Sequence, residues 1–448
     1  MEYFYSQKRT EIRFSKEEIA KILKQEIEKI DDIFVENFNE NLLGLLDKDE
    51  ECSFYTHYKT QIDDYYEDIF SNLRDKTDSI RSNILNKYLL SDNLSFLISN
   101  GCSLYAGSKE INKAVELEYY DKIRNFKSRY KYLNKTMLEL LNNKRPEEVL
   151  DKLYEFGSYC ENIIRDRETS KKVNSLINDV KKEFVQKFIL SIDYNKNDYH
   201  KMFLKRLSFR DNKLNIVNIF TLNYDLLIEK TAEELGLVVN NGFSGFHNRV
   251  FMPSTFHMGV HINQSNGERL YTKGVNLFKL HGSISWKFDN KPPYGIIEQQ
   301  KDYSNITFED IPDCIIYPVQ SKKKYSLDLP YSEMFRQFIE ILNKPNSTLI
   351  VMGYSFLDEH VNDIITNALA KPDFNLVVFS YQERSDPDIS SYLKVLFERS
   401  LEDSRISIFS GNILGNFEYI NKLLLTYPQS DEPEKILYKT FDRLKNGV

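Results

Sequence analysis

Seven short apolar runs recur between residues 94 and 410 and constrain the fold more than any other feature of the sequence. Stretches with helical periodicity separate several of them, such as LDEHVNDIITNALA at 357–370. Short runs that are apolar throughout are typical of strands buried on both faces. Their alternation with helices predicts an α/β fold with a parallel sheet covered on both sides. The runs are LSFLIS (94–99), LNIVNIFTL (214–222), NLFKL (276–280), CIIYPV (314–319), TLIVMGY (348–354), NLVVFS (375–380) and RISIFS (405–410).

Charged helical patterns flank and interrupt these runs. Residues 1–90 are predicted to be helical, with Ser15 in FSKEEIAKIL as the start of a capping box. Charged helical periodicity returns over about 110–210, which predicts a helical insertion after the first strand. A last helical segment, 413–448, closes the chain. The sheet domain is therefore expected over 91–412, with this insertion inside it and helical extensions at both ends.

Composition narrows the class of protein. The 448 residues include 41% hydrophobic and 13% aromatic residues, as in folded globular proteins. The formal net charge is -7 with both signs interspersed, so we expect no direct nucleic-acid partner. No stretch approaches the ~18 apolar residues of a membrane-spanning helix, and the opening residues lack the apolar core of a signal peptide. The four cysteines are far apart, which suits a reducing compartment. We expect a cytoplasmic protein without membrane contact.

Four of the apolar runs end in small or polar residues. In an open parallel sheet, ligands bind outside the carboxyl ends of the strands. We therefore expect these four segments to meet around one cavity. They are SNGCSLYAG (99–107), TLNYD (221–225), LHGS (280–283) and GYSFLDEH (353–360).

The first two segments combine glycine with polar side chains. Gly101 would leave backbone N–H groups open to the close approach of a phosphate, although Asn100 followed by Gly101 is also typical of a type I′ hairpin turn. Asn223 and Asp225 stand where an apolar run ends and a helical pattern begins. An amide can orient a hydroxyl group or water, but Asn and Asp are also favoured helix N-caps. The residues alone leave both interpretations open.

The other two segments carry a histidine and a second glycine turn. His281 lies at a strand end and is followed by glycine. An imidazole with an ordinary pKa of about 6.5 can exchange a proton near neutral pH, whereas an isolated histidine is more often structural. Gly353 permits a sharp turn, and Ser355 and Asp358 have capping-box spacing. A strand–turn–helix junction would explain this last segment even without a ligand.

Together and in this order, the four segments resemble the sirtuin-like family. The Gly-Tyr-Ser-Phe stretch at 353–356 is typical of its bacterial anti-phage defence branch, in which infection triggers NAD hydrolysis. The resemblance covers roughly residues 90–412, interrupted by the helical insertion. It implies a Rossmann-like parallel sheet that binds NAD, to which the helical patterns add a large helical insertion and helical N- and C-terminal extensions.

The resemblance also implies a role for each segment. Asn223 would hold the ribose or the attacking water, and His281 would act as a general base, so these two would be the catalytic residues. Asp225 would contact the nicotinamide carboxamide, and the turn after 353 would receive the adenosine side of NAD. The NAD-binding residues implied in this way are Gly101, Ser103, Asp225, Gly353 and Ser355.

The chain departs from deacylating sirtuins in ways that bear on its chemistry. Only Gly101 remains of the leading Gly-Ala-Gly turn. Deacylating sirtuins usually carry a four-cysteine zinc module after the His-Gly pair, whereas only Cys314 follows His281 here. His257 and His261 lack a third metal ligand. We expect no metal, and hydrolysis of NAD itself is favoured over deacylation.

The function implied is therefore an NAD⁺ glycohydrolase that cleaves NAD⁺ to nicotinamide and ADP-ribose in abortive infection. Two alternatives stay open: an NAD-dependent lysine deacylase, and a non-catalytic subunit that binds NAD or ADP-ribose in a defence assembly. Unrestrained NAD hydrolysis would kill the host, so control by assembly is expected. The expected partners are further copies of the chain, an ATPase of the DNA-translocase type, or a phage-derived activator.

Overall fold

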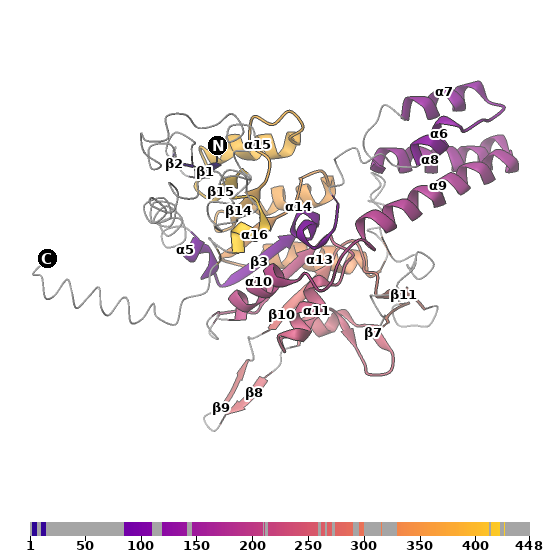
Figure 1. Cartoon of the computed structure of the whole chain (residues 1–448). Helices are drawn as coiled ribbons and strands as arrows, with labels where there is room; N and C mark the ends of the chain where they lie inside the picture. Colours follow the sequence, from indigo (N-terminus) through magenta and orange to yellow (C-terminus); the bar gives the residue numbers. More distant parts are fainter. Residues whose placement is uncertain are drawn as a thin grey trace, which may run out of the picture.

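The centre of the computed structural model is one sheet to which both ends of the chain contribute strands (Figure 1). Helices cover the sheet, and a bundle of helices projects away from it. The structure describes residues 2–6, 10–14, 85–109, 119–140, 146–208, 210, 214–258, 261–264, 267–270, 274–289, 295–299, 315, 329–411, 414–421 and 425.

Seven strands of this sheet run parallel, in the spatial order β5-β10-β4-β3-β13-β14-β15. Without the short edge strand β5, the sequence order is 3-2-1-4-5-6, which is the Rossmann order. The predicted α/β, Rossmann-like fold is therefore confirmed. The strands are β3 (Asn93–Ile98), β4 (Val217–Thr221), β5 (Val238–Asn240), β10 (Gly274–Lys279), β13 (Ser347–Met352), β14 (Asn375–Ser380) and β15 (Ile406–Ser410).

Six of the seven apolar runs lie in these parallel strands. The seventh, 314–319, is described only at Ile315, which forms an isolated antiparallel bridge with Gly282. The other residues of that run lie outside the described part of the chain.

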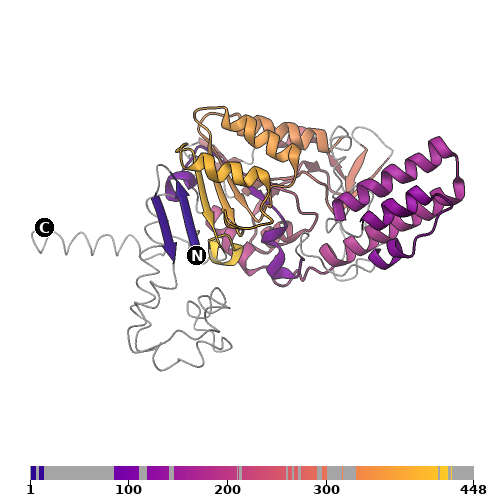
Figure 2. The same ribbon diagram turned by 90° about the horizontal axis from the view of Figure 1, so that it is seen from above.

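Two antiparallel strands extend the sheet beyond β15. They are β1 (Glu2–Ser6) and β2 (Thr10–Phe14), and β1 pairs with β15 (Figure 2). The N-terminal region 1–90, predicted to be helical from FSKEEIAKIL onwards, thus begins with two strands, because EYFYS and TEIRF are rich in aromatic and β-branched residues and find an open sheet edge to pair with. The short helix α5 (Asn86–Leu89) is described in this region. The predicted cap at Ser15 lies outside the described residues.

The sheet separates two hydrophobic cores. Successive side chains of a strand point to opposite faces, and all six residues of β3 are buried. Phe96 and Ile98 pack on the side of α10 (Asp198–Ser208) and α11 (Leu227–Glu234). Leu97 packs on the other side, against residues of α13 (Tyr331–Leu342), α14 (Glu359–Leu369) and α15 (Ser391–Ser400). Truncating a fully buried phenylalanine such as Phe96 to alanine costs roughly 3–5 kcal/mol.

The predicted helical insertion follows β3 and includes a bundle that projects from the body of the molecule in both views (Figures 1 and 2). Its helices share a hydrophobic core of their own, to which Leu153, Leu176 and Ile177 contribute. Asp166 caps the longest helix by accepting hydrogen bonds from the N–H groups of Glu168 and Thr169. The helices of the bundle, here called the arm, are α6 (Tyr119–Arg124), α7 (Lys131–Leu140), α8 (Pro146–Tyr159) and α9 (Arg167–Phe188).

Short antiparallel strands, which the sequence patterns do not predict, lie between β5 and α13 in the sequence. A four-stranded sheet consists of β6 (Phe243–Ser244), β7 (Arg249–Phe251), β11 (Trp286–Phe288) and β12 (Ile296–Glu298). A separate hairpin joins β8 (His261–Gln264) to β9 (Gly267–Leu270). The single tryptophan, Trp286, is buried in the core against Phe243.

Of the predicted C-terminal helical segment, the structure describes α16 (Phe417–Tyr419) and a few flanking residues. Across the described part of the chain, no helix is both long and apolar enough to cross a membrane.

Candidate functional site

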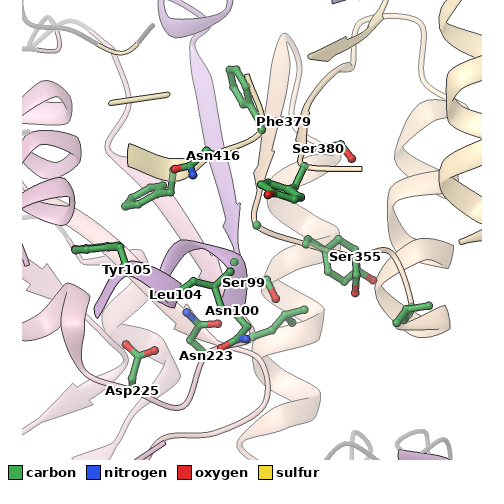
Figure 3. Close-up of a pocket in the computed structure, with 18 of the residues that line it drawn as sticks. Ser99, Asn100, Leu104, Tyr105, Asn223, Asp225, Ser355, Phe379, Ser380 and Asn416 are labelled. Carbon is green, nitrogen blue, oxygen red and sulfur yellow. The ribbon is translucent and has the colours of Figure 1, made fainter. Parts of the chain in front are cut away.

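A cavity of about 610 Å³ lies at the carboxyl ends of the parallel strands (Figure 3). Its volume is in the range of small-molecule binding pockets. It spans the β3–β13 boundary, where the strand order reverses and where open α/β sheets bind ligands. The described lining residues are 99–101, 104–105, 222–225, 281, 353–355, 357–358, 379–382 and 415–418, with Phe184 and Ile189.

At this boundary the two glycine turns touch each other. The N–H group of Gly101 donates a hydrogen bond of 3.0 Å to the carbonyl oxygen of Gly353. A Cβ on Gly101 would lie 2.6 Å from Gly353 Cα, so neither turn has room for a side chain. Gly353 has a φ of +66°, which glycine adopts without strain. The predicted sharp turn at Gly353 is confirmed.

The prediction of an open N–H group at Gly101 is wrong, because that group is already bonded to Gly353. The N–H groups of Cys102 and Ser103 are bonded to the carbonyls of Ser99 and Asn100 in the same turn. This turn is a 3-10 helix, η2 (Asn100–Cys102), so the alternative of a hairpin is also wrong. Gly101 lines the cavity through its close contact with the neighbouring turn.

Asn223 and Asp225 are linked through Ser103. The Asn223 side-chain amide donates to Ser103 Oγ at 3.0 Å, and Ser103 Oγ donates to Asp225 Oδ2 at 3.0 Å. Ser103 is fully buried and is not among the lining residues, so the structure places it behind Asn223 and Asp225 rather than at the cavity surface. Asp225 also accepts from the N–H group of Leu227, the first residue of α11, so part of the capping interpretation holds.

A buried lysine, Lys279, holds the segment 223–225 in place. Lys279, at the end of β10, donates to the backbone carbonyls of Tyr224 and Asp225. Its Nζ also lies 3.0 Å from a carboxylate oxygen of Glu229 on α11. Burial raises the pKa of Glu229 to about 7, although the nearby ammonium opposes this shift. Lys279 therefore holds the segment that carries Asn223 against the strand that leads to His281.

His281 faces the first turn of α14. Its Nε2 lies 3.1 Å from Asp358 Oδ2, and both side chains are only 6% exposed. Asp358 is the N-cap of α14, since its Oδ1 accepts from the N–H groups of His360 and Val361. The predicted capping box beginning at Ser355 is therefore wrong, because the helix begins three residues later. Ser355 instead lines the cavity.

An apolar wall comes from the last turn of α9 and the residue that follows it. Phe184 and Ile189 line the cavity, and they pack with Leu226 and Ile284. The ring of Tyr224 lies between Phe184 and His281, with ring-centre distances of 6.2 and 6.4 Å. No local sequence pattern predicts this wall, because α9 belongs to a helical pattern far from any strand end.

The opposite wall lies at the ends of β14 and β15. A Cβ on Gly415 would lie 2.1 Å from the carbonyl oxygen of Ser380, so these two segments are in close contact. Asn416 caps α16 by accepting from the N–H group of Glu418. In Figure 3, Asn223 and Asp225 lie on one side of the opening, and Ser355 and Ser380 lie on the other. A glycine followed by a capping residue after the last apolar run is the signal that could have found this wall.

Beside Leu104, the half-buried Tyr105 contacts the buried His200. The Tyr105 hydroxyl lies 2.6 Å from His200 Nδ1. Burial raises the pKa of Tyr105 and lowers that of His200 to about 4, so both side chains are neutral at physiological pH.

Among the described lining residues, the charged side chains are three carboxylates, with His281 as the titratable neighbour and no lysine or arginine. Carboxylates accept hydrogen bonds from hydroxyl and amide groups, and they favour a cationic ring over an anionic one. The carboxylates belong to Asp225, Asp358 and Glu418.

The structure thus brings six of the seven predicted site residues to one cavity and places Ser103 behind two of them. In particular, Asn223 and His281 line the same space, although 58 positions separate them in the sequence. In the described ranges, no group of three or more His, Cys, Asp or Glu side chains could hold a metal ion.

Fold and cavity together define a Rossmann-like protein with its site at the point where the strand order reverses. Residues 217–407 match the sequence model of the SIR2-like domain, which supports the sirtuin-like family and a function that involves NAD. Five of the predicted site residues lie within the matched range, whereas Gly101 and Ser103 precede it. No curated protein matches the chain.

Proposed function

We propose that the protein is an NAD⁺ glycohydrolase, which converts NAD⁺ and water to nicotinamide, ADP-ribose and a proton. The observation that supports this most directly is the shared cavity of Asn223 and His281 at the reversal point of the sheet. The SIR2-like match over 217–407 adds support for NAD as the ligand.

In this reaction the bond between C1′ of the ribose and the nicotinamide nitrogen breaks, and its electron pair neutralises the charged ring. Because the leaving group departs as a neutral molecule, it needs no proton. The enzyme must hold the ribose, exclude bulk water and align one nucleophile with C1′. Asn223 is suited to orient the ribose or the water, because Ser103 fixes its amide. His281 accepts the proton that the water loses as it adds to C1′.

The carboxylates of the cavity suit this substrate. Positive charge develops on the ribose as the bond breaks, and fixed negative groups near that charge lower the energy of the transition state. Asp225 lies beside Asn223, held by Ser103 and by the N–H group of Leu227. A carboxylate at this position accepts hydrogen bonds from the carboxamide of nicotinamide or from a ribose hydroxyl group.

The direct test is incubation of the purified protein with NAD⁺ and measurement of released nicotinamide. We expect Asn223→Ala and His281→Ala each to lower the rate by at least ~100-fold, because the first removes an orienting group and the second a positioned base. His247→Ala and Asn248→Ala remove the same residue types from an exposed turn and should keep wild-type rates. Equal release by wild type and by both site variants would refute the assignment.

The same assay separates hydrolysis from deacylation. An acetyl-lysine peptide is added in a second arm, and consumption of NAD⁺ is compared with and without it. A hydrolase consumes NAD⁺ in both arms, whereas a deacylase consumes it only with peptide. Tight NAD⁺ binding without turnover in either arm would instead favour the non-catalytic subunit.

We also propose a role in abortive infection, with activity controlled by assembly. The support is the resemblance of the 353–356 stretch to the defence branch, together with the danger of uncontrolled NAD⁺ loss. Other copies of the chain, a DNA-translocase ATPase or a phage protein are the proposed partners. Cells that carry the protein should lose NAD⁺ after phage infection but not during uninfected growth, and a steady NAD⁺ level in infected cells would count against this role.

A further inference from the structure

Asp358 divides its two carboxylate oxygens between two tasks. Oδ1 accepts hydrogen bonds of 3.1 and 3.3 Å from the N–H groups of His360 and Val361, and so caps α14. Oδ2 lies 3.1 Å from Nε2 of His281. The contacts of Oδ1 are those of an ordinary helix cap. The contact of Oδ2 connects α14 to His281, the candidate base.

The cap of α9 shows that capping does not require this division. Asp166 also uses Oδ1 for two N–H groups, but its Oδ2 accepts from the hydroxyl group of Thr169 and pairs with the exposed Arg129. Asp358 instead directs its second oxygen at a buried imidazole that lines the cavity. Its first oxygen is held by the backbone of a rigid helix, so the position of the second is fixed as well.

The backbone around Asp358 reinforces this geometry. The Tyr354 hydroxyl shares its one proton between the carbonyl oxygen of Asp358 at 3.1 Å and Asn362 Oδ1 at 3.0 Å. Asn362 in turn donates to the carbonyl oxygen of Phe356, which has a left-handed φ of +57°. The turn between β13 and α14 is therefore held by side chains from both of its ends.

We propose that Asp358 is the positioning residue of His281: it orients the imidazole and stabilises the imidazolium that forms when His281 accepts the proton from water. This proposal rests on the proposed hydrolase function for its effect on catalysis. The proton moves from the water to His281 and later to solvent, and Asp358 remains ionised throughout. A carboxylate next to an imidazole favours its charged form, so Asp358 assists most when the proton has been transferred.

Other titratable groups lie near Asp358 and His281, and they are the same in wild type and in the Asp358 variants described next. Tyr224 and Asp225 follow β4, and the ring of Tyr224 lies 6.4 Å from that of His281. Lys279, the last residue of β10, lies two positions before His281 and is paired with Glu229. None of these groups changes when Asp358 is replaced, so a shift in the pH profile reports on Asp358 itself.

The decisive variant is Asp358→Asn. Asparagine is as good an N-cap as aspartate, so the helix cap is retained while the negative charge beside His281 is lost. We expect nicotinamide release at saturating NAD⁺ to fall at least ~10-fold. We also expect the acid limb of the pH profile to move to lower pH, because the protonated imidazole is no longer stabilised. Asp166→Asn makes the same change at the cap of α9 and should leave both quantities at wild-type values.

Wild-type turnover and an unchanged pH profile in Asp358→Asn would overturn the proposal and would leave Asp358 as a helix cap only. Asp358→Ala adds a contrast, because it removes charge and cap together. If only the alanine variant lost activity, the effect would be structural and the proposal would again fail.

A measurement without NAD⁺ separates this inference from the proposed function. The chain has seven histidines, so the imidazole signals in an NMR titration can be assigned with His281→Ala as reference. In Asp358→Asn, the midpoint of His281 protonation should fall by at least about half a pH unit. An unchanged midpoint overturns the pairing even if wild type hydrolyses NAD⁺. A shifted midpoint in a protein that releases no nicotinamide supports the pairing and refutes the hydrolase.

Discussion

At the residue scale, the contact between the two glycine turns gives a sharp prediction. Gly353 and Gly236 have nearly the same φ, +66° and +64°, but differ in their surroundings. A Cβ on Gly353 would lie 2.6 Å from the backbone nitrogen of Cys102, whereas a Cβ on Gly236 would have no atom within 4 Å. Alanine at Gly236 therefore tests the strain of a left-handed backbone alone, whereas alanine at Gly353 adds a steric clash to that strain.

We expect Gly236→Ala to lower the free energy of unfolding by about 1–2 kcal/mol, from backbone strain alone. Gly353→Ala should lower it by roughly 2–5 kcal/mol, because overpacking adds about 1–3 kcal/mol. Gly353→Ala should also abolish NAD⁺ turnover, since it separates the β3 and β13 turns at the cavity. Urea denaturation and nicotinamide release measure the two effects, and equal stability of the two variants would contradict the contact.

Glu229 gives a prediction for the dependence of stability on pH. Its pKa in the folded protein is about 7, above its ordinary value of 4.5, because burial disfavours the carboxylate. The folded state therefore binds this proton more tightly than the unfolded state does. The resulting stabilisation is fully present below pH 4.5 and is lost as the pH rises through about 7.

We expect wild type to lose free energy of unfolding between pH 4.5 and 7 relative to Glu229→Gln, which cannot ionise. The difference between the two proteins, from urea denaturation at several pH values, isolates this group from the other carboxylates. A difference that stays constant across the window would show that Lys279 keeps Glu229 ionised.

The sequence predicts the candidate catalytic side chains of the site better than the residues that hold them in place. Asn223 and His281 could be found because each ends a buried parallel strand, and such ends meet at one edge of the sheet. The burial of Ser103 could not be found, because it depends on the direction of a side chain within a 3-10 turn. The contribution of Phe184 depends on where a distant helix packs, which no local pattern contains.

At the scale of elements, α9 belongs to two cores at once. Leu176 packs within the arm, whereas Phe184, two turns later, packs against the cavity segment. We expect alanine at either position to destabilise the protein, by roughly 2–5 kcal/mol for Leu176→Ala and 3–5 kcal/mol for Phe184→Ala. Only Phe184→Ala should raise the KM for NAD⁺, because only that side chain lines the cavity. Steady-state kinetics test this, and an equal change of KM in both variants would contradict a local role for Phe184.

Some strands of the fold can be predicted from sequence patterns, and others cannot. Buried parallel strands such as β3 and β13 are mostly apolar and buried at every position, so their sequences identify them. Strands of two or three residues, such as β6 and β12, are too short to carry a pattern. The hairpin of β1 and β2 depends on the open edge of β15, which is a property of the assembled sheet.

At the scale of the whole molecule, the arm is the natural candidate for control. It has its own hydrophobic core and projects from the sheet (Figure 1). Phe184, near the end of α9, lines the cavity. Large apolar side chains are exposed on it, including Tyr159 at the end of α8 and Ile163 in η4 (Cys160–Ile164), the π-helical turn that joins α8 to α9 within the arm. Exposed apolar groups on a projecting element favour contact with another protein surface.

If the active form is an assembly of copies joined through the arm, wild type should sediment above the mass of a single chain, and activity per chain should rise with concentration. Ile163→Glu places a charge on the arm and should shift both the mass and the activity towards those of the monomer. Phe246→Glu makes the same kind of change at an exposed turn of the β6–β7 hairpin and should affect neither. Sedimentation velocity and nicotinamide release on the same samples measure the two quantities. A wild-type protein that is strictly monomeric and active at every concentration would refute control by assembly, because nothing would then restrain NAD⁺ loss in an uninfected cell.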